Sequence, residues 1–210
     1  MAIGAPSNDG NGECSGHVRV YRLDANQAWK KIGDDIDGEA DGDGSAQSVS
    51  LSADGMTVAI GAPYNVGVYG FDIGHVRVYR LDDNQAWKKI GDGIDGEAAE
   101  DLSGASVSLS ADGDTVAIGA RGNDGNGNVR VYRLDDNQTW KMIGDDFDGD
   151  GLSVSLSADG YTVGIGAEDS VRVYRLARIP PSQSPSSGSG RLQTSVAIAS
   201  VATALVYVAL

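Results

Sequence analysis

The sequence predicts an all-β protein that forms part of a β-propeller, with about 3.5 to 4 four-stranded blades. Three observations predict this fold: the chain repeats itself, each repeat holds four strand-like runs, and no amphipathic helix pattern occurs before residue 190. One repeated string, Val-Arg-Val-Tyr-Arg, begins at Val18, Val76, Val129 and Val171. A second, Ser-Leu-Ser-Ala-Asp-Gly, begins at Ser50, Ser108 and Ser155. Near-identical units of this length indicate a repeat architecture.

The first two strands of the repeat are predicted from their alternation and their apolar character. In residues 48–52, serines alternate with Val49 and Leu51, which is the period of a β-strand. Asp54 and Gly55 follow, and Asp-Gly between two such runs predicts a hairpin because glycine accepts a positive φ. The next run, residues 57–62, is continuously apolar, so we expect a strand that is covered on both faces.

The third strand is predicted at residues 75–81 and the fourth around Trp87. Four antiparallel strands in a unit of roughly 40 to 58 residues are typical of a propeller blade. The chain then holds three, four, four and three strands, which predicts fourteen strands in an open arc or in a strained four-bladed closure. A β-solenoid is the less favoured alternative, because its shorter coils seldom contain two-residue hairpins.

Charge and cysteine content exclude several classes of partner. The formal net charge is −14, which argues against a nucleic-acid ligand and favours a self-repelling surface. Cys14 is the single cysteine, so no internal disulfide and no cysteine-based metal site can form.

The chain opens in the middle of a repeat and without a signal peptide, so we expect it to be the C-terminal part of a longer protein or an incomplete gene model.

The repeat resembles the FG-GAP repeats of the integrin α-chain propeller and of many bacterial and algal surface proteins. Residues 3–6 and 60–63 both read Ile-Gly-Ala-Pro, the "GAP" half, and each precedes a Gly/Asn-rich loop and a Val-Arg-Val-Tyr strand. Residues 103–107 stand where the "FG" half would be, with serine in place of phenylalanine. The resemblance implies a seven-bladed ring, of which this chain supplies about half. It also implies a non-catalytic, cell-surface adhesion function.

Calcium binding is one of two interpretations of the acidic connections between blades. The FG-GAP resemblance implies a calcium loop between the first and second strands, but that connection is only Ala-Asp-Gly here, too short to wrap an ion. The acidic residues instead follow the fourth strand, where they form either a solvated rim, which we favour, or a calcium site. The candidate ligands are Asp35, Asp37, Glu39, Asp41, Asp43, Asp95, Glu97 and Asp101.

Histidines, tryptophans and one asparagine complete the candidate functional residues. His17 and His75 occupy the same repeat position, and no nucleophile motif lies nearby, so we expect no catalytic residue. The tryptophans recur at one position, which favours packing between blades over sugar stacking; they are Trp29, Trp87 and Trp140. Asn137 begins the only N-glycosylation sequon, Asn137-Gln138-Thr139.

The composition changes after the repeats, which divides the chain into three parts. Residues 1–177 form the repeat region, residues 178–195 a Pro/Ser/Gly-rich stalk and spacer, and residues 196–210 an uncharged apolar tail. Small residues followed by a spacer and a terminal apolar tail predict a GPI-attachment signal; a single-pass membrane anchor is the alternative. The predicted attachment region is Ser186, Ser187, Gly188 and Ser189.

These features predict a non-catalytic binding or adhesion module on the extracellular face of a membrane. We expect its ligand to be an extracellular protein or glycan and its tail to attach it to the membrane. Two alternatives stay open: an enzyme or accessory domain that acts on surface polysaccharide, and a gene-model fragment without independent function.

Overall fold

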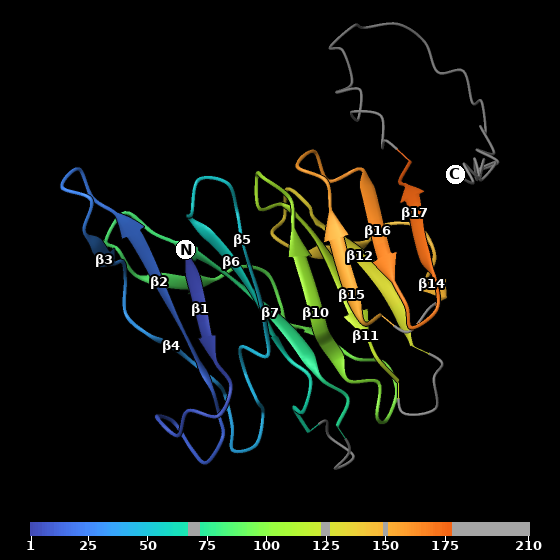
Figure 1. Cartoon of the computed structure of the whole chain (residues 1–210), viewed down its shortest axis with the longest axis horizontal. Coiled ribbons are helices and arrows are strands. Elements are labelled where there is room, and N and C mark those ends of the chain that lie inside the picture. The colour runs from blue at the N-terminus through green and yellow to red at the C-terminus, as the bar shows by residue number, and fades with distance from the viewer. Residues whose placement is uncertain (67–71, 123–126, 149–150, 178–210) are drawn as a thin grey trace, which may run out of the picture.

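The computed structural model describes residues 1–66, 72–122, 127–148 and 151–177. These residues form four antiparallel sheets that stand side by side as successive blades (Figure 1). Blade 1 contains β1 (Ala2–Ala5), β2 (His17–Leu23), β3 (Trp29–Lys31) and β4 (Ile36–Asp37). Blade 2 contains β5 (Ser48–Leu51), β6 (Thr57–Ala62), β7 (His75–Leu81), β8 (Trp87–Lys89) and β9 (Ile94–Asp95). Blade 3 contains β10 (Ser103–Leu109), β11 (Thr115–Ala120), β12 (Asn128–Leu134), β13 (Trp140–Met142) and β14 (Phe147–Asp148). Blade 4 contains β15 (Ser153–Leu156), β16 (Thr162–Gly166) and β17 (Val171–Arg175).

This arrangement confirms the predicted all-β partial propeller, and the described residues contain no helix. The strand count differs from the prediction, because the described chain has seventeen strands and not fourteen. The three additional strands are the two-residue β4, β9 and β14, which turn back and pair with the beginning of the third strand of their own blade. The acidic connections therefore contain a short strand each and are not simple links between blades.

Local sequence explains the second strand of blades 2 and 3, which is β6 and β11. Every residue of β6 and of β11 is buried, as expected for strands with neighbouring blades on both faces. The hairpin before β6 turns at Gly55, whose φ is +72°, while the Asp54 carboxylate accepts hydrogen bonds from the Ser52 hydroxyl and the Met56 amide. The predicted Asp-Gly hairpin is therefore present, and its aspartate fixes the turn.

The hydrophobic core consists of clusters that lie between consecutive blades. Between blades 2 and 3, for example, Val76 and Val78 pack with Val116, Ile118 and Trp140. Equivalent clusters join blade 1 to blade 2 and blade 3 to blade 4. Each blade is therefore stabilised by its neighbours, which is the nearest-neighbour energetics of a repeat protein.

The arc is open, because the outer faces of its first and last blades are exposed. Val171 and Val173 of β17 are 81% and 65% exposed, whereas their counterparts Val76 and Val78 in β7 are 0% and 2% exposed. Trp29 in blade 1 is 53% exposed. Figure 1 shows these two blades at opposite ends of the row. A strained four-bladed closure would bury both faces against each other.

Among the described residues no helix is long and apolar enough to cross a membrane. The predicted stalk, the attachment region Ser186–Ser189 and the apolar tail lie outside the described residues.

Candidate functional site

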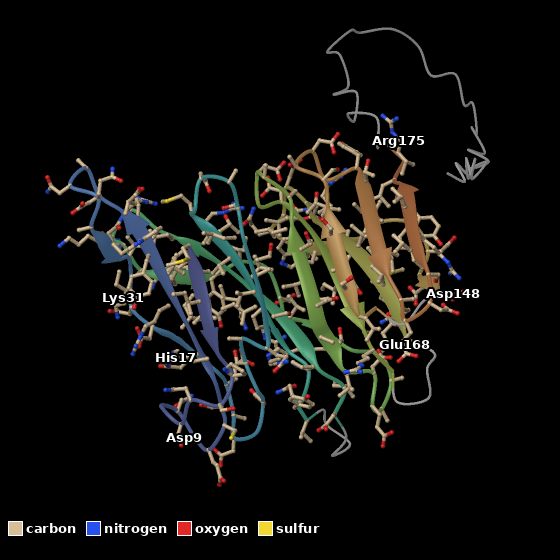
Figure 2. All side chains as sticks on the ribbon, in the orientation of Figure 1. Asp9, His17, Lys31, Asp148, Glu168 and Arg175 are labelled. Carbon is tan, nitrogen blue, oxygen red and sulfur yellow. The ribbon has the colours of Figure 1, made fainter. Side chains whose placement is uncertain are left out.

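The acidic connections and the loops after β1 and β6 meet at one end of the blades. We call this surface the acidic loop face and define it as residues 6–16, 37–47, 63–66, 72–74 and 95–102. Backbone hydrogen bonds join its parts, from the Gly38 amide to the Gly16 carbonyl (2.8 Å) and from the Gly96 amide to the Gly74 carbonyl (2.9 Å). Figure 2 shows Asp9 and His17 toward this end and Arg175 at the opposite end.

Side chains of the first loop stabilise its own turns. The Asn8 side chain accepts a hydrogen bond from the Gly10 amide, and the Asp9 carboxylate accepts one from the Cys14 amide. Asn11 donates to the Gly38 carbonyl oxygen, which ties the loop to the acidic connection. The predicted turn chemistry is confirmed for this loop; the matching run at residues 123–126 lies outside the described residues.

Arg77 joins the acidic connection of blade 1 to that of blade 2. Its guanidinium donates to the Glu39 carboxylate at 3.2 Å and to the Asp95 carboxylate at 2.7 Å. Burial raises the pKa of Glu39, but the hydrogen bonds from Arg77 together with the positive charges of Arg77, His75 and Lys89 outweigh burial and leave that pKa below its usual value. The Arg77 side chain is itself mostly buried, so this cluster is a fixed structural element and not a mobile surface pair.

Arg130 repeats the same arrangement one blade further on. Its guanidinium lies 2.9 Å from the Asp146 carboxylate, 3.1 Å from that of Glu97 and 3.7 Å from that of Asp101. The Asp101 carboxylate also accepts a hydrogen bond from the Glu97 amide. Four of the predicted calcium ligands (Glu39, Asp95, Glu97 and Asp101) are therefore paired with Arg77 or Arg130.

The remaining candidate ligands have separate roles. Hydrogen bonds from Arg19 and then from Lys31 hold the pKa of Asp35 well below its usual range. The Asp43 side chain is buried, where it accepts hydrogen bonds from the Ala40 amide and the Asn65 side chain. Asp37 and Asp41, in contrast, are exposed on the acidic loop face.

The candidate ligands do not fit a calcium ion. In the part of the chain that the structure describes, no three Asp, Glu, His or Cys side chains lie close enough together to hold a metal ion. Calcium needs six to eight oxygen ligands, whereas these carboxylates face arginines and backbone amides. The described residues therefore do not support the calcium interpretation. Pairing with arginines is a third role for the acidic connections, besides the solvated rim and the calcium site.

The two histidines lie beneath the acidic loop face. His17 and His75 are both buried, and each begins the third strand of its blade opposite Asp37 or Asp95 of the returning strand. Burial, followed by the positive charge of Arg77, lowers the pKa of His75 to about 4, so this imidazole is neutral at pH 7. Its Nδ1 atom has no hydrogen-bond partner among the described residues.

Two of the tryptophans pack between blades. The Trp87 indole Nε1 donates to the Ile32 carbonyl oxygen of blade 1, and the Trp140 Nε1 donates to the Ile90 carbonyl oxygen of blade 2. Trp29 occupies the same repeat position on the exposed face of blade 1. The packing interpretation is therefore confirmed for Trp87 and Trp140.

The sequon residue Asn137 is exposed in the turn between β12 and β13, where its backbone amide donates to the Asp135 carboxylate. This position leaves the side chain accessible to a glycosyltransferase if the protein is exported.

Comparison with known proteins identifies the fold and no more. No protein-family model matches the chain, and no curated protein matches it either. Among solved structures it is similar to a protein from Bacteroides uniformis assigned as a 6-phosphogluconolactonase (16% identity, TM-score 0.55). The alignment covers 76% of this chain and 44% of that one.

Two further structures show the same likeness. The periplasmic gluconolactonase PpgL of Pseudomonas aeruginosa aligns at 18% identity and a TM-score of 0.50, covering 83% of this chain and 49% of that one. A protein from Bacteroides fragilis assigned as a 6-phosphogluconolactonase aligns at 13% identity and a TM-score of 0.52, covering 82% and 54%. The chain thus spans about half the length of the propellers it matches.

Proposed function

We propose that this chain is a non-catalytic binding module of the FG-GAP propeller type, which acts at the cell surface through its acidic loop face. One observation carries the proposal. The acidic connections are held in place by Arg77 and Arg130, while Asp37 and Asp41 stay exposed beside them. A surface that is already ordered before binding loses little conformational entropy when a ligand docks. Loops on a rigid scaffold are also the usual place for recognition.

The charge of this surface favours a basic protein ligand. The chain carries a formal net charge of −14, and exposed carboxylates lie on the acidic loop face. Such a field attracts a lysine- or arginine-rich segment and repels anionic glycans and nucleic acids. We therefore place an extracellular protein with a basic patch ahead of a glycan as the ligand.

The FG-GAP part of the proposal rests on the two Ile-Gly-Ala-Pro segments, at residues 3–6 and 60–63. Gly4 and Gly61 each pack against the backbone of the next blade, at Ala46 and Gly104, so there is no space for a side chain at this repeat position. The likeness to lactonases concerns the fold alone, since identities of 13–18% carry no activity from one propeller to another.

Membrane attachment is proposed from the sequence of the tail. The small residues Ser186–Ser189 precede a spacer and an apolar segment of residues 196–210, the order found in GPI-attachment signals. The chain preceded by an export signal should appear on a eukaryotic cell surface, and phosphatidylinositol-specific phospholipase C should release it. Retention with an intact C-terminal peptide would replace the lipid with a membrane-spanning anchor, and a cytosolic location would contradict the surface proposal.

Ligand binding is tested on the same displayed chain with a panel of immobilised basic proteins, neutral glycans and sulfated glycans. We expect a basic protein to bind, and Asp37→Asn with Asp41→Asn to reduce its binding at least about 10-fold. The matched control is Asp83→Asn with Asp136→Asn, which removes the same charge from exposed turns at the opposite end of the blades. Equal loss in both variants would show general electrostatic attraction, and binding of sulfated glycans alone would contradict the proposed ligand class.

A further inference from the structure

We propose that the exposed faces of blades 1 and 4 are the two halves of one interface, through which two copies of this chain join head to tail and close into a ring. The proposal is independent of the ligand-binding function above. The same interface recurs between consecutive blades within the chain.

Within the chain, two valines of each third strand are covered by the next blade. Val76 and Val78 are packed by Leu109, Val116, Ile118 and Trp140 of blade 3. The matching valines of blades 1 and 3 are also at most 1% exposed; they are Val18, Val20, Val129 and Val131. The next blade therefore always buries this pair.

Blade 4 has the same pair and no covering blade among the residues that the structure describes. Val171 and Val173 are 81% and 65% exposed, although they hold the repeat positions of Val76 and Val78. Burying this pair as the internal pairs are buried would remove an exposed apolar surface from water, which is the main driving force for association. The face of blade 4 is thus suited to receive another blade of this repeat.

Blade 1 presents most of the residues that cover this pair. Strand register places Ile3 opposite Arg19, as Ile118 lies opposite Arg130, and places Trp29 opposite Leu23, as Trp140 lies opposite Leu134. Met1 lies two residues before Ile3 and bonds to Tyr21, as Val116 lies two residues before Ile118 and opposite Tyr132. Three of the four covering side chains therefore have a counterpart on blade 1, namely Met1, Ile3 and Trp29, and all three are about half exposed.

The shape of this face also suits a docking partner. A hollow of about 360 Å³ opens beside Met1, Leu23 and Trp29, and its far wall is the hairpin at Asp54 and Gly55 of blade 2. No counterpart of Leu109 fills this space among the described residues of blade 1. The hollow is lined by apolar side chains and also by Arg22, Ser52 and Asp54, and it leaves space beside blade 1 for side chains of another blade.

Blade arithmetic permits closure by two copies. The chain supplies four sheets, so two copies supply eight, which is within the usual range of four to eight propeller blades. The chain also covers 44–54% of each matched propeller, so it corresponds to about half a ring. Two identical head-to-tail contacts would close the assembly and leave neither face exposed.

The first measurement is the mass of the full chain by sedimentation equilibrium over a concentration series. We expect a dimer, and Val171→Lys with Val173→Lys should raise its dissociation constant at least about 100-fold. Met142→Lys is the control: Met142 is an exposed apolar residue away from both faces, and lysine already stands at its repeat position in Lys31 and Lys89. This variant should remain a dimer.

A mixing experiment establishes the head-to-tail geometry. The blade 4 variant above and a blade 1 variant, Ile3→Lys with Trp29→Lys, should each be monomeric alone and should form a one-to-one pair when mixed, because one intact face of each kind remains. Circular dichroism verifies that each variant is folded. A monomeric wild-type chain, assemblies larger than a dimer, or a dimer insensitive to both variants would overturn the proposal. The last result would assign association to another segment, such as residues 196–210.

Discussion

The indole Nε1 of Trp87 donates a hydrogen bond to the carbonyl oxygen of Ile32, 3.1 Å away in the preceding blade. Trp140 repeats this contact with Ile90 at 3.0 Å. One donor in the outer part of blade 2 and one in blade 3 thus fix the position of each blade against the preceding one. The acceptor is a backbone carbonyl oxygen. The same contact can therefore form in different repeats, whichever side chain the acceptor residue carries.

Trp87→Phe tests the energetic contribution of this contact. The substitution keeps a ring between the blades but leaves the Ile32 carbonyl without its donor, so the free energy of unfolding should fall by about 1–2 kcal/mol. Trp29→Phe is the matched control, because Trp29 has no preceding blade in the chain. Both are measured by urea denaturation in the Val171→Lys, Val173→Lys background, which prevents a second copy from covering Trp29. Equal destabilisation by both variants would contradict the inter-blade role.

Arg130→Gln tests the arginine pairs beneath the acidic connections. Three carboxylates would lose their common partner, and the partly exposed positions of Glu97 and Asp146 limit the cost to about 1–2 kcal/mol. Arg172→Gln at the same repeat position should cost less than about 0.5 kcal/mol, because Arg172 is exposed and bonds a single carbonyl oxygen. The measurement is again the urea midpoint, and an unchanged midpoint for Arg130→Gln would show that the pairs contribute nothing to stability.

His75 gives the fold a predictable dependence on pH. Burial lowers its pKa to about 4 in the folded chain, whereas an unfolded histidine has a pKa of about 6.5. The unfolded state therefore binds the proton first, and stability should fall as the pH drops from about 6.5 to 4, by at most about 1.4 kcal/mol per pH unit. At the acid end of this window and below it, the lowered pKa values of Asp35 and Glu39 add further acid destabilisation.

His75→Asn, which introduces the residue found at this repeat position in blade 3, should flatten the stability curve between pH 6.5 and 4. Melting temperatures measured across this range provide the test. A curve that stays as steep as that of the wild type would assign the pH dependence to other groups.

Two glycine substitutions test the close approach of successive blades. A Cβ at Gly61 would collide with the Gly104 carbonyl oxygen and the Ser48 hydroxyl, so Gly61→Ala should destabilise by about 1–3 kcal/mol. Gly164 has open space, with its nearest atom, the Ser155 carbonyl oxygen, 3.8 Å away, and alanine stands at its repeat position in β6 and β11. Gly164→Ala should therefore stabilise by about 0.5–1 kcal/mol. The opposite order of melting temperatures would contradict the blade stacking.

Calcium should have little specific effect on the repeat region. Millimolar calcium should change the melting temperature by no more than about 1 °C relative to sodium at equal ionic strength, because the described residues offer no group of ligands. A larger, calcium-specific increase that Asp37→Ala with Asp41→Ala abolishes would restore the calcium interpretation.

Repetition made the blades predictable from the sequence, because period-two serines at residues 48–52 and the apolar run at residues 57–62 recur with the same hairpin between them. The strands β4, β9 and β14 were not predicted, since two residues are too short to show a period. Their pairing with His17, His75 or Asn128 depends on the fold of the whole blade.

The acidic connections were found from composition alone, but their partners were not. Glu39 and Arg77 belong to different blades, and only the stacking of blades brings them together. A signal was present in the sequence, because the arginine of Val-Arg-Val recurs with the acidic connections. The recurrence of two sets of opposite charges at fixed repeat positions could have suggested the pairing.

Hydrogen exchange measured on the Val171→Lys, Val173→Lys variant tests whether the stacked blades form an open arc. We expect amides of β6 and β11 to exchange slowest, since these strands are buried on both faces, and amides of β1 and β17 to exchange much faster. Equal protection of β1, β17 and the inner strands in this variant would show that the four blades close on themselves and would contradict the open arc.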